Sequence, residues 1–179
     1  MRALGEPIPD TALAEGVAKA DVAGRLQAFD RDGIQIVVDV GHNPQAAREL
    51  AVWLQGAPAK AAGAEVPPAE ASLAKAHRTY AVFAALGDKD LAGVVSALAE
   101  RIYAWFLAGL ADVNPRGLEV DAFAERLSAT AAAAGARHRT VPEALAAALA
   151  QARPGDRILV FGSFHTAAAA LEALDAANG

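Results

Sequence analysis

Hydrophobic positions along this chain follow two alternating patterns, which predict strands and helices in turn. Short apolar runs predict strands over Ile34–Val40, Thr79–Leu86, Ile102–Ala108 and Arg157–Phe161, although the tryptophan and phenylalanine of the third run would also suit a helix. Apolar residues at helical spacing predict helices over Pro44–Gln55, Leu91–Leu98, Glu119–Ala134, Val141–Ala152 and Thr166–Ala177. The chain therefore reads as strands separated by helices for most of its length.

This alternation predicts an α/β fold of the Rossmann-like, doubly wound kind, with a mainly parallel sheet and helices on both faces. Strands buried on both sides, such as those containing Ile36–Val38 and Ile158–Phe161, need helices above and below them. Right-handed crossovers then bring the carboxyl ends of the parallel strands to one edge of the sheet. We expect any ligand site at that edge.

Two stretches do not follow the regular pattern. Met1–Ala28 carries Pro7, Pro9, Gly16 and Gly24 around a possible short helix over Thr11–Lys19, and we interpret it as a lead-in segment. Gly56–His77 is rich in alanine, proline and glycine, and we expect a partly helical excursion or a loop there.

The composition of the chain excludes some classes of function but does not identify one. The chain has 179 residues, 54 % of them hydrophobic, and a formal net charge of −5. It has no run of basic residues that would track a nucleic-acid backbone, and no apolar segment long enough for a membrane span, so neither partner is expected. Because there are no cysteines and no secretory signal pattern, we expect a cytoplasmic protein without thiolate metal sites.

The first polar cluster, Asp39–Asn43, lies between a predicted strand and a predicted helix. Asp39 is placed like the carboxylates that bind ribose hydroxyls, or else it caps the helix that follows. His42 can contact a phosphate or orient a reacting group, or it bonds to local backbone. Asn43 can contact an adenine edge and can also be the N-cap of the helix, with Pro44 at its first position.

Two more clusters follow later strands. Gly87–Asp90 places Lys89 at a helix start, where a cation opposes the helix dipole, so an anionic ligand is attractive; a solvated turn is the alternative. Gly162–Thr166 offers two hydroxyls and His165 at another helix start, where a carboxylate or phosphate binds well; capping by Ser163 or Thr166 is the alternative. Asn114–Gly117, after the third predicted strand, is a possible fourth cluster.

Arg25 precedes the first predicted strand and can bind a phosphate with its planar guanidinium. The sequence contains neither the G-x-x-x-x-G-K-[ST] loop nor G-x-G-x-x-G, so another region must hold a triphosphate. It lacks the G-x-S-x-G elbow of serine hydrolases, and no set of histidines and carboxylates has metal-ligand spacing.

Gly24–Gln27, Asp39–Pro44, Leu86–Asp90 and Gly162–Thr166, in this order, resemble the C-terminal domain of folylpolyglutamate synthase/dihydrofolate synthase, a Mur-type ligase. The resemblance extends from about Ala3 to Leu174. It departs from the family at Gly41, where alanine is usual. It implies that residues 1–24 are a lead-in and hinge from a preceding domain, and that residues 25–179 form the Mur-ligase-type C-terminal domain.

The resemblance also implies the chemistry. ATP converts a folate or dihydropteroate carboxylate into an acyl phosphate, which the amino group of L-glutamate attacks to form an amide. Arg25, Asp39 and Asn43 would contact the nucleotide. His42 and Lys89 would be catalytic and, with Ser163 and His165, would bind glutamate. Mg²⁺ ligands are expected in an N-terminal P-loop domain, so the chain alone is predicted to be inactive.

Two alternatives remain at this point. The chain can be a stand-alone α/β module that binds a nucleotide or an amino acid without catalysis, or it can derive from a ligase of cell-wall synthesis. The residue types in His42–Pro44 and Ser163–Thr166 resemble those of the folate ligases more than those of the cell-wall ligases.

Overall fold

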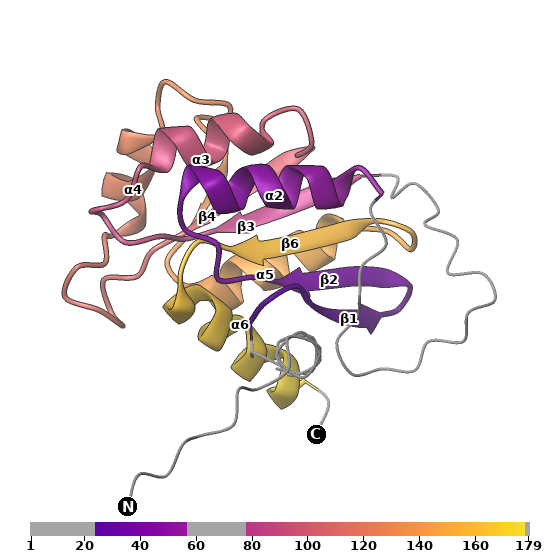
Figure 1. The fold of residues 1–179 in the computed structure, drawn as a ribbon. Helices are drawn as coiled ribbons and strands as arrows, with labels where there is room; N and C mark the ends of the chain where they lie inside the picture. The colour runs from indigo at the N-terminus through magenta and orange to yellow at the C-terminus, as the bar shows by residue number, and fades with distance from the viewer. Residues whose placement is uncertain (1–23, 57–77, 178–179) are drawn as a thin grey trace, which may run out of the picture.

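The computed structural model describes residues 24–56 and 78–177, which form one α/β unit (Figure 1). The possible helix over Thr11–Lys19 and nearly all of the Gly56–His77 segment lie outside the described residues. The elements follow in the order β1 (Gln27–Arg31), β2 (Ile34–Val38), α2 (Pro44–Leu54), β3 (Thr79–Phe83), α3 (Leu91–Leu98), β4 (Ala104–Ala108), α4 (Val120–Arg126), β5 (Ala136–His138), α5 (Val141–Gln151), β6 (Arg157–Phe161) and α6 (Phe164–Ala176).

The six strands form one sheet in the order β1-β2-β6-β3-β4-β5. β1 is antiparallel to β2, and all the other neighbouring pairs are parallel. Val38 of β2, Val160 of β6 and Val82 of β3 lie in register across the centre. The predicted mainly parallel sheet is confirmed, and the carboxyl ends of β2, β6, β3 and β4 share one edge.

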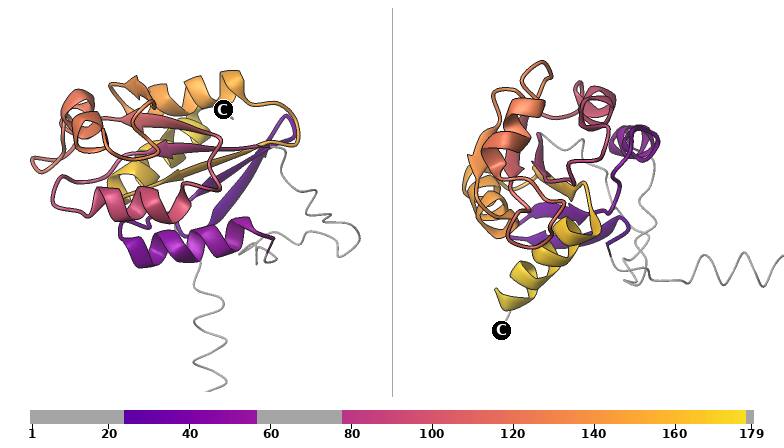
Figure 2. Two further views of the ribbon diagram at one scale, coloured as in Figure 1. Left: turned by 90° about the horizontal axis from the view of Figure 1, so that it is seen from above. Right: turned by 90° about the vertical axis from the view of Figure 1, so that its left-hand side faces the viewer.

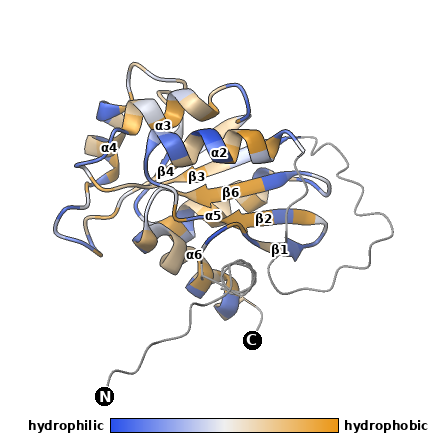
Figure 3. Cartoon of the chain, viewed as in Figure 1, coloured by the Kyte–Doolittle hydropathy of each residue, from blue (hydrophilic) through white to orange (hydrophobic). Residues whose placement is uncertain are grey.

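Helices cover both faces of the sheet, as the doubly wound prediction requires. α5 and α6 pack on the face that contains Ile36, Val82 and Val160. α2, α3 and α4 pack on the opposite face, which contains Val37, Phe83 and Phe161 (Figure 2). Because successive strand residues point to opposite faces, both faces are apolar, and β2 and β6 are coloured hydrophobic for most of their length (Figure 3).

Most predicted elements are present, with shorter strands. β2 ends at Val38, β3 ends at Phe83 and β4 begins at Ala104, although the amides of the next residues, Asp39, Ala84 and Tyr103, still donate to the neighbouring strands. α6 begins at Phe164 rather than Thr166, because the side chain of Ser163 accepts the amide of Thr166 and is the N-cap.

The predicted helix over Glu119–Ala134 is wrong in its second half. α4 ends at Arg126, and turns follow it. The hydroxyl of Thr130 donates to the Leu127 carbonyl at 2.7 Å and accepts the Ala132 amide at 3.2 Å. These local bonds replace helical ones, so the apolar spacing continues without the helix.

Two strands were not predicted. β1 joins β2 through the two-residue turn Asp32-Gly33, with φ values of 54° and 77°. Positive φ at both turn positions is the hairpin geometry that Asp-Gly favours, and this dipeptide was the available signal. β5 is a three-residue edge strand with an exposed start, and it has no periodic pattern to detect.

No helix within residues 24–56 and 78–177 is both long enough and apolar enough to cross a membrane.

Candidate functional site

A cavity of about 240 Å³ opens at the edge of the sheet where β2 and β6 end. The loop before β1, the turn after β2, the start of α2 and the start of α6 enclose it. Its lining comprises Arg25, Leu26, Asp39, Val40, Gly41, His42, Asn43, Ala46, Glu49, Leu50 and Phe164. Four predicted site residues, Arg25, Asp39, His42 and Asn43, therefore lie in one cavity.

Asp39 is held between two backbone amides. Its Oδ2 accepts the amide of Leu26 at 3.0 Å, and its Oδ1 accepts the amide of Gly41 at 2.6 Å. Burial raises the pKa of Asp39 above the ordinary aspartate value, although these two hydrogen bonds and the charge of Arg25 oppose the rise. The alternative that Asp39 caps the next helix is wrong, because Asn43 does so.

Asn43 and His42 each use one polar atom for local structure and keep one for the cavity. The Oδ1 of Asn43 accepts the Ala46 amide at 2.9 Å, so the Nδ2 amide group can only donate to a ligand. The Nδ1 of His42 lies 3.2 Å from the Val40 carbonyl, which can only accept, so Nδ1 carries the proton. In the neutral ring Nε2 is then the acceptor that remains.

Phe164 is a cavity residue to which sequence reasoning gave no role. It is 60 % exposed although it is large and apolar, and it lies at the start of α6 on the cavity wall. An exposed aromatic face beside a cation, a carboxylate and an amide donor can stack on a base or a sugar. The signal was an aromatic residue directly after the predicted cap Ser163.

Lys89 lies in the turn between β3 and α3, outside the lining of that cavity. Its Nζ is 3.3 Å from Asp88 Oδ2, which Arg116 also approaches at 3.5 Å. Desolvation acts to raise the pKa of Asp88, but the hydrogen bond and charge of Lys89 together with the charge of Arg116 outweigh it, so the pKa is lowered overall. Asp90 is the N-cap of α3 through the Gly93 amide.

Arg126 adds a third cation beside this turn, through a hydrogen bond to the Gly87 carbonyl. Three cationic side chains thus lie with the two carboxylates of Asp88 and Asp90. Lys89, whose side chain is 30 % exposed, can accept an incoming anion here.

Ser163 is buried, and its hydroxyl group already has hydrogen-bond partners within the protein. Its Oγ accepts the Thr166 amide at 3.0 Å and lies 2.7 Å from the Thr166 hydroxyl, which in turn donates to the Ala84 carbonyl at 2.6 Å. The capping alternative is confirmed for Ser163. These bonds tie the start of α6 to the end of β3, so the loop after β6 is held against its neighbour.

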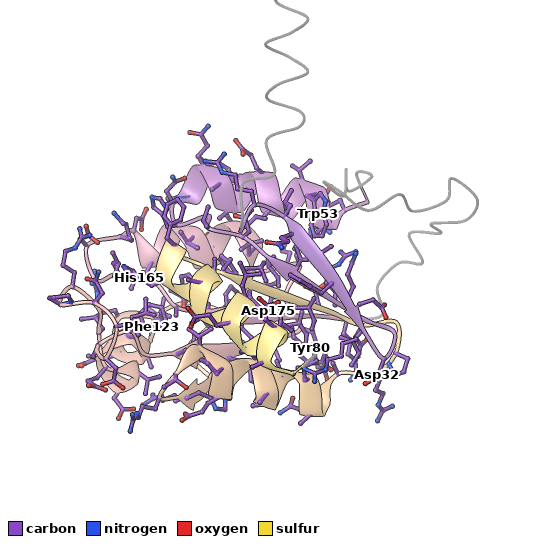
Figure 4. All side chains as sticks on the ribbon, turned by 90° about the horizontal axis from the view of Figure 1, so that it is seen from below. Asp32, Trp53, Tyr80, Phe123, His165 and Asp175 are labelled. Carbon is purple, nitrogen blue, oxygen red and sulfur yellow. The ribbon has the colours of Figure 1, made fainter. Side chains whose placement is uncertain are left out.

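His165 points away from the cavity lining and toward the loop after β4. Its Nε2 lies 2.8 Å from Nδ2 of Asn114. Figure 4 labels His165 at the start of α6, with Asp175 near the other end of that helix. Asn114–Gly117, the possible fourth cluster, therefore contacts a predicted site residue.

The two groups of residues are neighbours along one edge. The first turns of α2 and α3 pack so closely that a Cβ on Gly93 would lie 2.8 Å from Cγ of Pro44. Asn43 and Asp90, the caps that precede these turns, are therefore adjacent. Phe164 and His165, which are consecutive in α6, link the cavity to the Lys89 side of the edge.

The donor set fits a nucleotide better than a metal ion. The cavity offers a guanidinium for phosphate, a carboxylate for hydroxyls, an amide donor for a base edge and an aromatic face. Among residues 24–56 and 78–177, no group of three or more histidines and carboxylates is arranged to hold a metal ion. Those residues alone do not form a metal centre.

Comparison with known proteins matches this fold and these residues to one family. The family described as Mur ligase, glutamate ligase domain, matches residues 24–164. The dihydrofolate synthase/folylpolyglutamate synthase of Escherichia coli is 32 % identical over 176 residues, which cover 98 % of this chain.

Two solved structures are similar in fold and sequence. E. coli FolC in complex with DHPP and ADP has a TM-score of 0.74 and 31 % identity, covering 98 % of this chain and 36 % of that one. A bifunctional folylpolyglutamate synthase/dihydrofolate synthase with Mn, AMPPNP and L-glutamate bound has a TM-score of 0.70 and 30 % identity, covering 95 % of this chain and 36 % of that one.

The chain spans only 36 % of the length of the E. coli relative that it matches. The match of the family description nevertheless covers most of the chain, including the cavity and the Lys89 turn. The chain belongs to the Mur ligase family, as its glutamate ligase domain.

Proposed function

We propose that this chain is the C-terminal domain of an ATP-dependent ligase that joins L-glutamate to a folate or dihydropteroate carboxylate. The supporting observation is the cavity that gathers Arg25, Asp39, His42 and Asn43 in a chain of this family. The relatives bind ADP or AMPPNP, DHPP and L-glutamate. The same ligands are the candidates for the full protein to which this chain belongs.

In this proposal the cavity takes the nucleotide. Arg25 is exposed and charged, and its guanidinium binds phosphate oxygens. Asp39 accepts from ribose hydroxyls with the lone pairs that its two amide bonds leave free. Asn43 donates from Nδ2 to the base, and Phe164 supplies an apolar face beside it.

The Lys89 side of the edge takes glutamate. Lys89 exchanges part of its contact with Asp88 for a glutamate carboxylate, and Arg116 keeps Asp88 neutralised. His42, which lines the cavity, keeps Nε2 as an acceptor and is suited to take the proton that the glutamate amino group loses as it attacks. His165 and Ser163 complete the pocket, Ser163 chiefly by holding the start of α6 in place.

The reaction is an acyl transfer. The glutamate amino group forms a bond to the acyl carbon, the bond from that carbon to the phosphate oxygen breaks, and inorganic phosphate leaves with the bonding pair. Phosphorylation of the acceptor carboxylate requires a region that holds the triphosphate and Mg²⁺. This chain has no P-loop motif, so we propose that an N-terminal P-loop domain supplies both.

The test is a titration of the purified chain with ADP and, separately, L-glutamate, followed by backbone amide NMR shifts. ADP should shift Gly41–Asn43, and glutamate should shift Lys89 and its neighbours. Arg25→Gln should weaken ADP binding, whereas Arg153→Gln, at the opposite edge of the sheet, should not. If neither ligand moves these amides, or if the chain alone forms the amide product, the proposal is wrong.

A further inference from the structure

The loop after β4 contains an amide side chain whose orientation is fixed by the structure. Asn114 Oδ1 accepts the backbone amide of Arg116 at 2.8 Å. Only the carbonyl oxygen of the side chain can meet an N–H group, so the Nδ2 amide group must face the other way. It faces Nε2 of His165, at 2.8 Å.

This arrangement decides which nitrogen of His165 carries the proton. The Nδ2 group of Asn114 can only donate, so the Nε2 atom that it faces must offer a lone pair. In a neutral imidazole with a bare Nε2, the proton is on Nδ1. A doubly protonated ring would place an N–H group against the Asn114 NH₂, which the geometry disfavours.

The loop that carries Asn114 is anchored on both sides. The Leu110 amide donates to the Leu118 carbonyl at 2.9 Å, and the Gly87 amide donates to the Arg116 carbonyl at 3.2 Å. A Cβ on Gly117 would overlap the Leu110 carbonyl oxygen, so the loop closes tightly there. Asn114 is therefore presented to His165 by a fixed backbone.

The same loop reaches Lys89. The guanidinium of Arg116 approaches Asp88 Oδ2 at 3.5 Å, and Lys89 approaches the same oxygen at 3.3 Å. Asn114 contacts His165 and Arg116 contacts the ion pair of Lys89, two residues apart in one loop. The loop after β4 thus connects two of the four predicted glutamate ligands, His165 from α6 and Lys89 from the turn after β3.

We propose that Asn114 is a positioning residue that holds His165 as the neutral Nδ1–H tautomer, so that the ring presents an N–H donor at the glutamate side of the site. His42 has its Nδ1–H bound to the Val40 carbonyl and presents a bare Nε2 instead. The two histidines at this edge then offer opposite hydrogen-bonding groups. That the acceptor of the His165 N–H is a glutamate carboxylate rests on the proposed function; the tautomer does not.

The test uses histidine ring ¹H–¹⁵N spectra of the 179-residue chain, with the His165 signals identified from their loss in His165→Gln. The wild-type ring should show a protonated Nδ1 and a bare Nε2. In Asn114→Asp the new carboxylate still accepts the Arg116 amide, so the turn is kept, but it faces Nε2 with an acceptor. Nε2 should then become protonated.

Val113→Asp is the matched control, because Val113 is 55 % exposed in the same loop and the variant adds the same charge. It should leave the His165 spectrum unchanged. A wild-type ring with a protonated Nε2, or an Asn114→Asp ring identical to the wild-type ring, would overturn the assignment.

A glutamate titration separates this inference from the proposed function. Asn114→Asp should weaken L-glutamate binding about tenfold relative to Val113→Asp, which corresponds to about 1.4 kcal/mol. If the tautomer changes as expected while the affinity of the two variants is equal, Asn114 positions His165 but the ring does not bind glutamate. If neither chain binds glutamate and the tautomer still changes, only the proposed function fails.

Discussion

The Oδ2 atom of Asp39 accepts the backbone amide of Leu26 at 3.0 Å, across 13 residues of chain. Leu26 has a φ of 45°, a left-handed conformation that is uncommon for a residue with a side chain. The carboxylate therefore stabilises a strained backbone next to Arg25. It shapes the cavity before any ligand is present.

Replacing Asp39 with asparagine should loosen this loop. An asparagine side chain has one carbonyl oxygen and cannot accept both the Leu26 and the Gly41 amides, so one of them loses its partner. We expect Asp39→Asn to lower the free energy of unfolding by about 1–3 kcal/mol, measured by urea denaturation at neutral pH.

Asp112→Asn is the control for that variant, because it removes an exposed carboxylate that pairs with Arg139 at 3.2 Å. Its effect should stay within about 0.5 kcal/mol. Equal stabilities for the two variants would contradict a structural role for the Asp39 carboxylate.

The raised pKa of Asp39 predicts a pH dependence with a definite sign. Between the ordinary aspartate pKa and the raised native value, the native state binds this proton more tightly than the unfolded state does. The contribution of Asp39 to stability therefore falls as the pH rises through that window, and it is constant above it.

Urea denaturation of the wild-type chain and Asp39→Asn at a series of acidic pH values isolates this contribution. The difference in unfolding free energy between the two should shrink as the pH rises through the window. A difference that grows instead would mean that the native pKa lies below the ordinary value.

Gly162 is expected to be sensitive to substitution for two separable reasons. Its φ is 121°, and an added Cβ would lie 2.5 Å from the Ala84 carbonyl oxygen. Gly56 has a φ of 110°, but an added Cβ there would meet none of residues 24–56 and 78–177 within 4 Å. Gly56→Ala therefore reports backbone strain alone, about 1–3 kcal/mol, and Gly162→Ala should cost more.

Thermal or urea midpoints of these two alanine variants provide the comparison. The difference between them measures how closely the loop after β6 approaches the end of β3. If Gly162→Ala is no more harmful than Gly56→Ala, the close approach at Ala84 is wrong.

Lys89→Met tests the glutamate side of the proposed site. Removing a charge-assisted contact should weaken L-glutamate binding at least about tenfold in the NMR titration. Because the Lys89 ion pair with Asp88 is partly exposed, the unfolding free energy should change by only about 0.5 kcal/mol or less.

Arg137→Met is the matched control, since it removes a cation from another exposed ion pair, with Asp121 at 3.0 Å on the β5 side. It should leave glutamate binding intact. Equal loss in both variants would mean that the overall charge, rather than Lys89, governs the binding.

The features that the sequence predicted are the ones that depend on burial of apolar residues and on helix capping. Ile36–Val38 and Ile158–Phe161 are apolar on both faces, and this fixed them as central parallel strands. Asn43 was identified as an N-cap because its side chain suits that position before an apolar stripe. The grouping of Arg25, Asp39 and Asn43 was expected from the family resemblance, whereas His42, expected beside Lys89 and Ser163, lines the same cavity as these three.

What the sequence did not show depends on contacts between distant residues. Nothing local indicates that Asp39 accepts the Leu26 amide, that Asn114 faces His165, or that Thr130 ends the helical pattern after Arg126. The β1 hairpin had a local signal in Asp32-Gly33, but the preceding residues alternate too weakly to identify a strand alone.

Polar contacts link the loops after three strands sideways: the hydroxyl of Thr166 reaches the carbonyl of Ala84 after β3, and the ring of His165 reaches Asn114 after β4. Thr166 and His165 both lie in the first turn of α6, so this one turn holds the loops after β3 and β4 in place. A chimaera that takes only one of these loops from a relative would contain one partner of each contact without the partner that matches it. Transplants in this family should therefore exchange the three loops as a set.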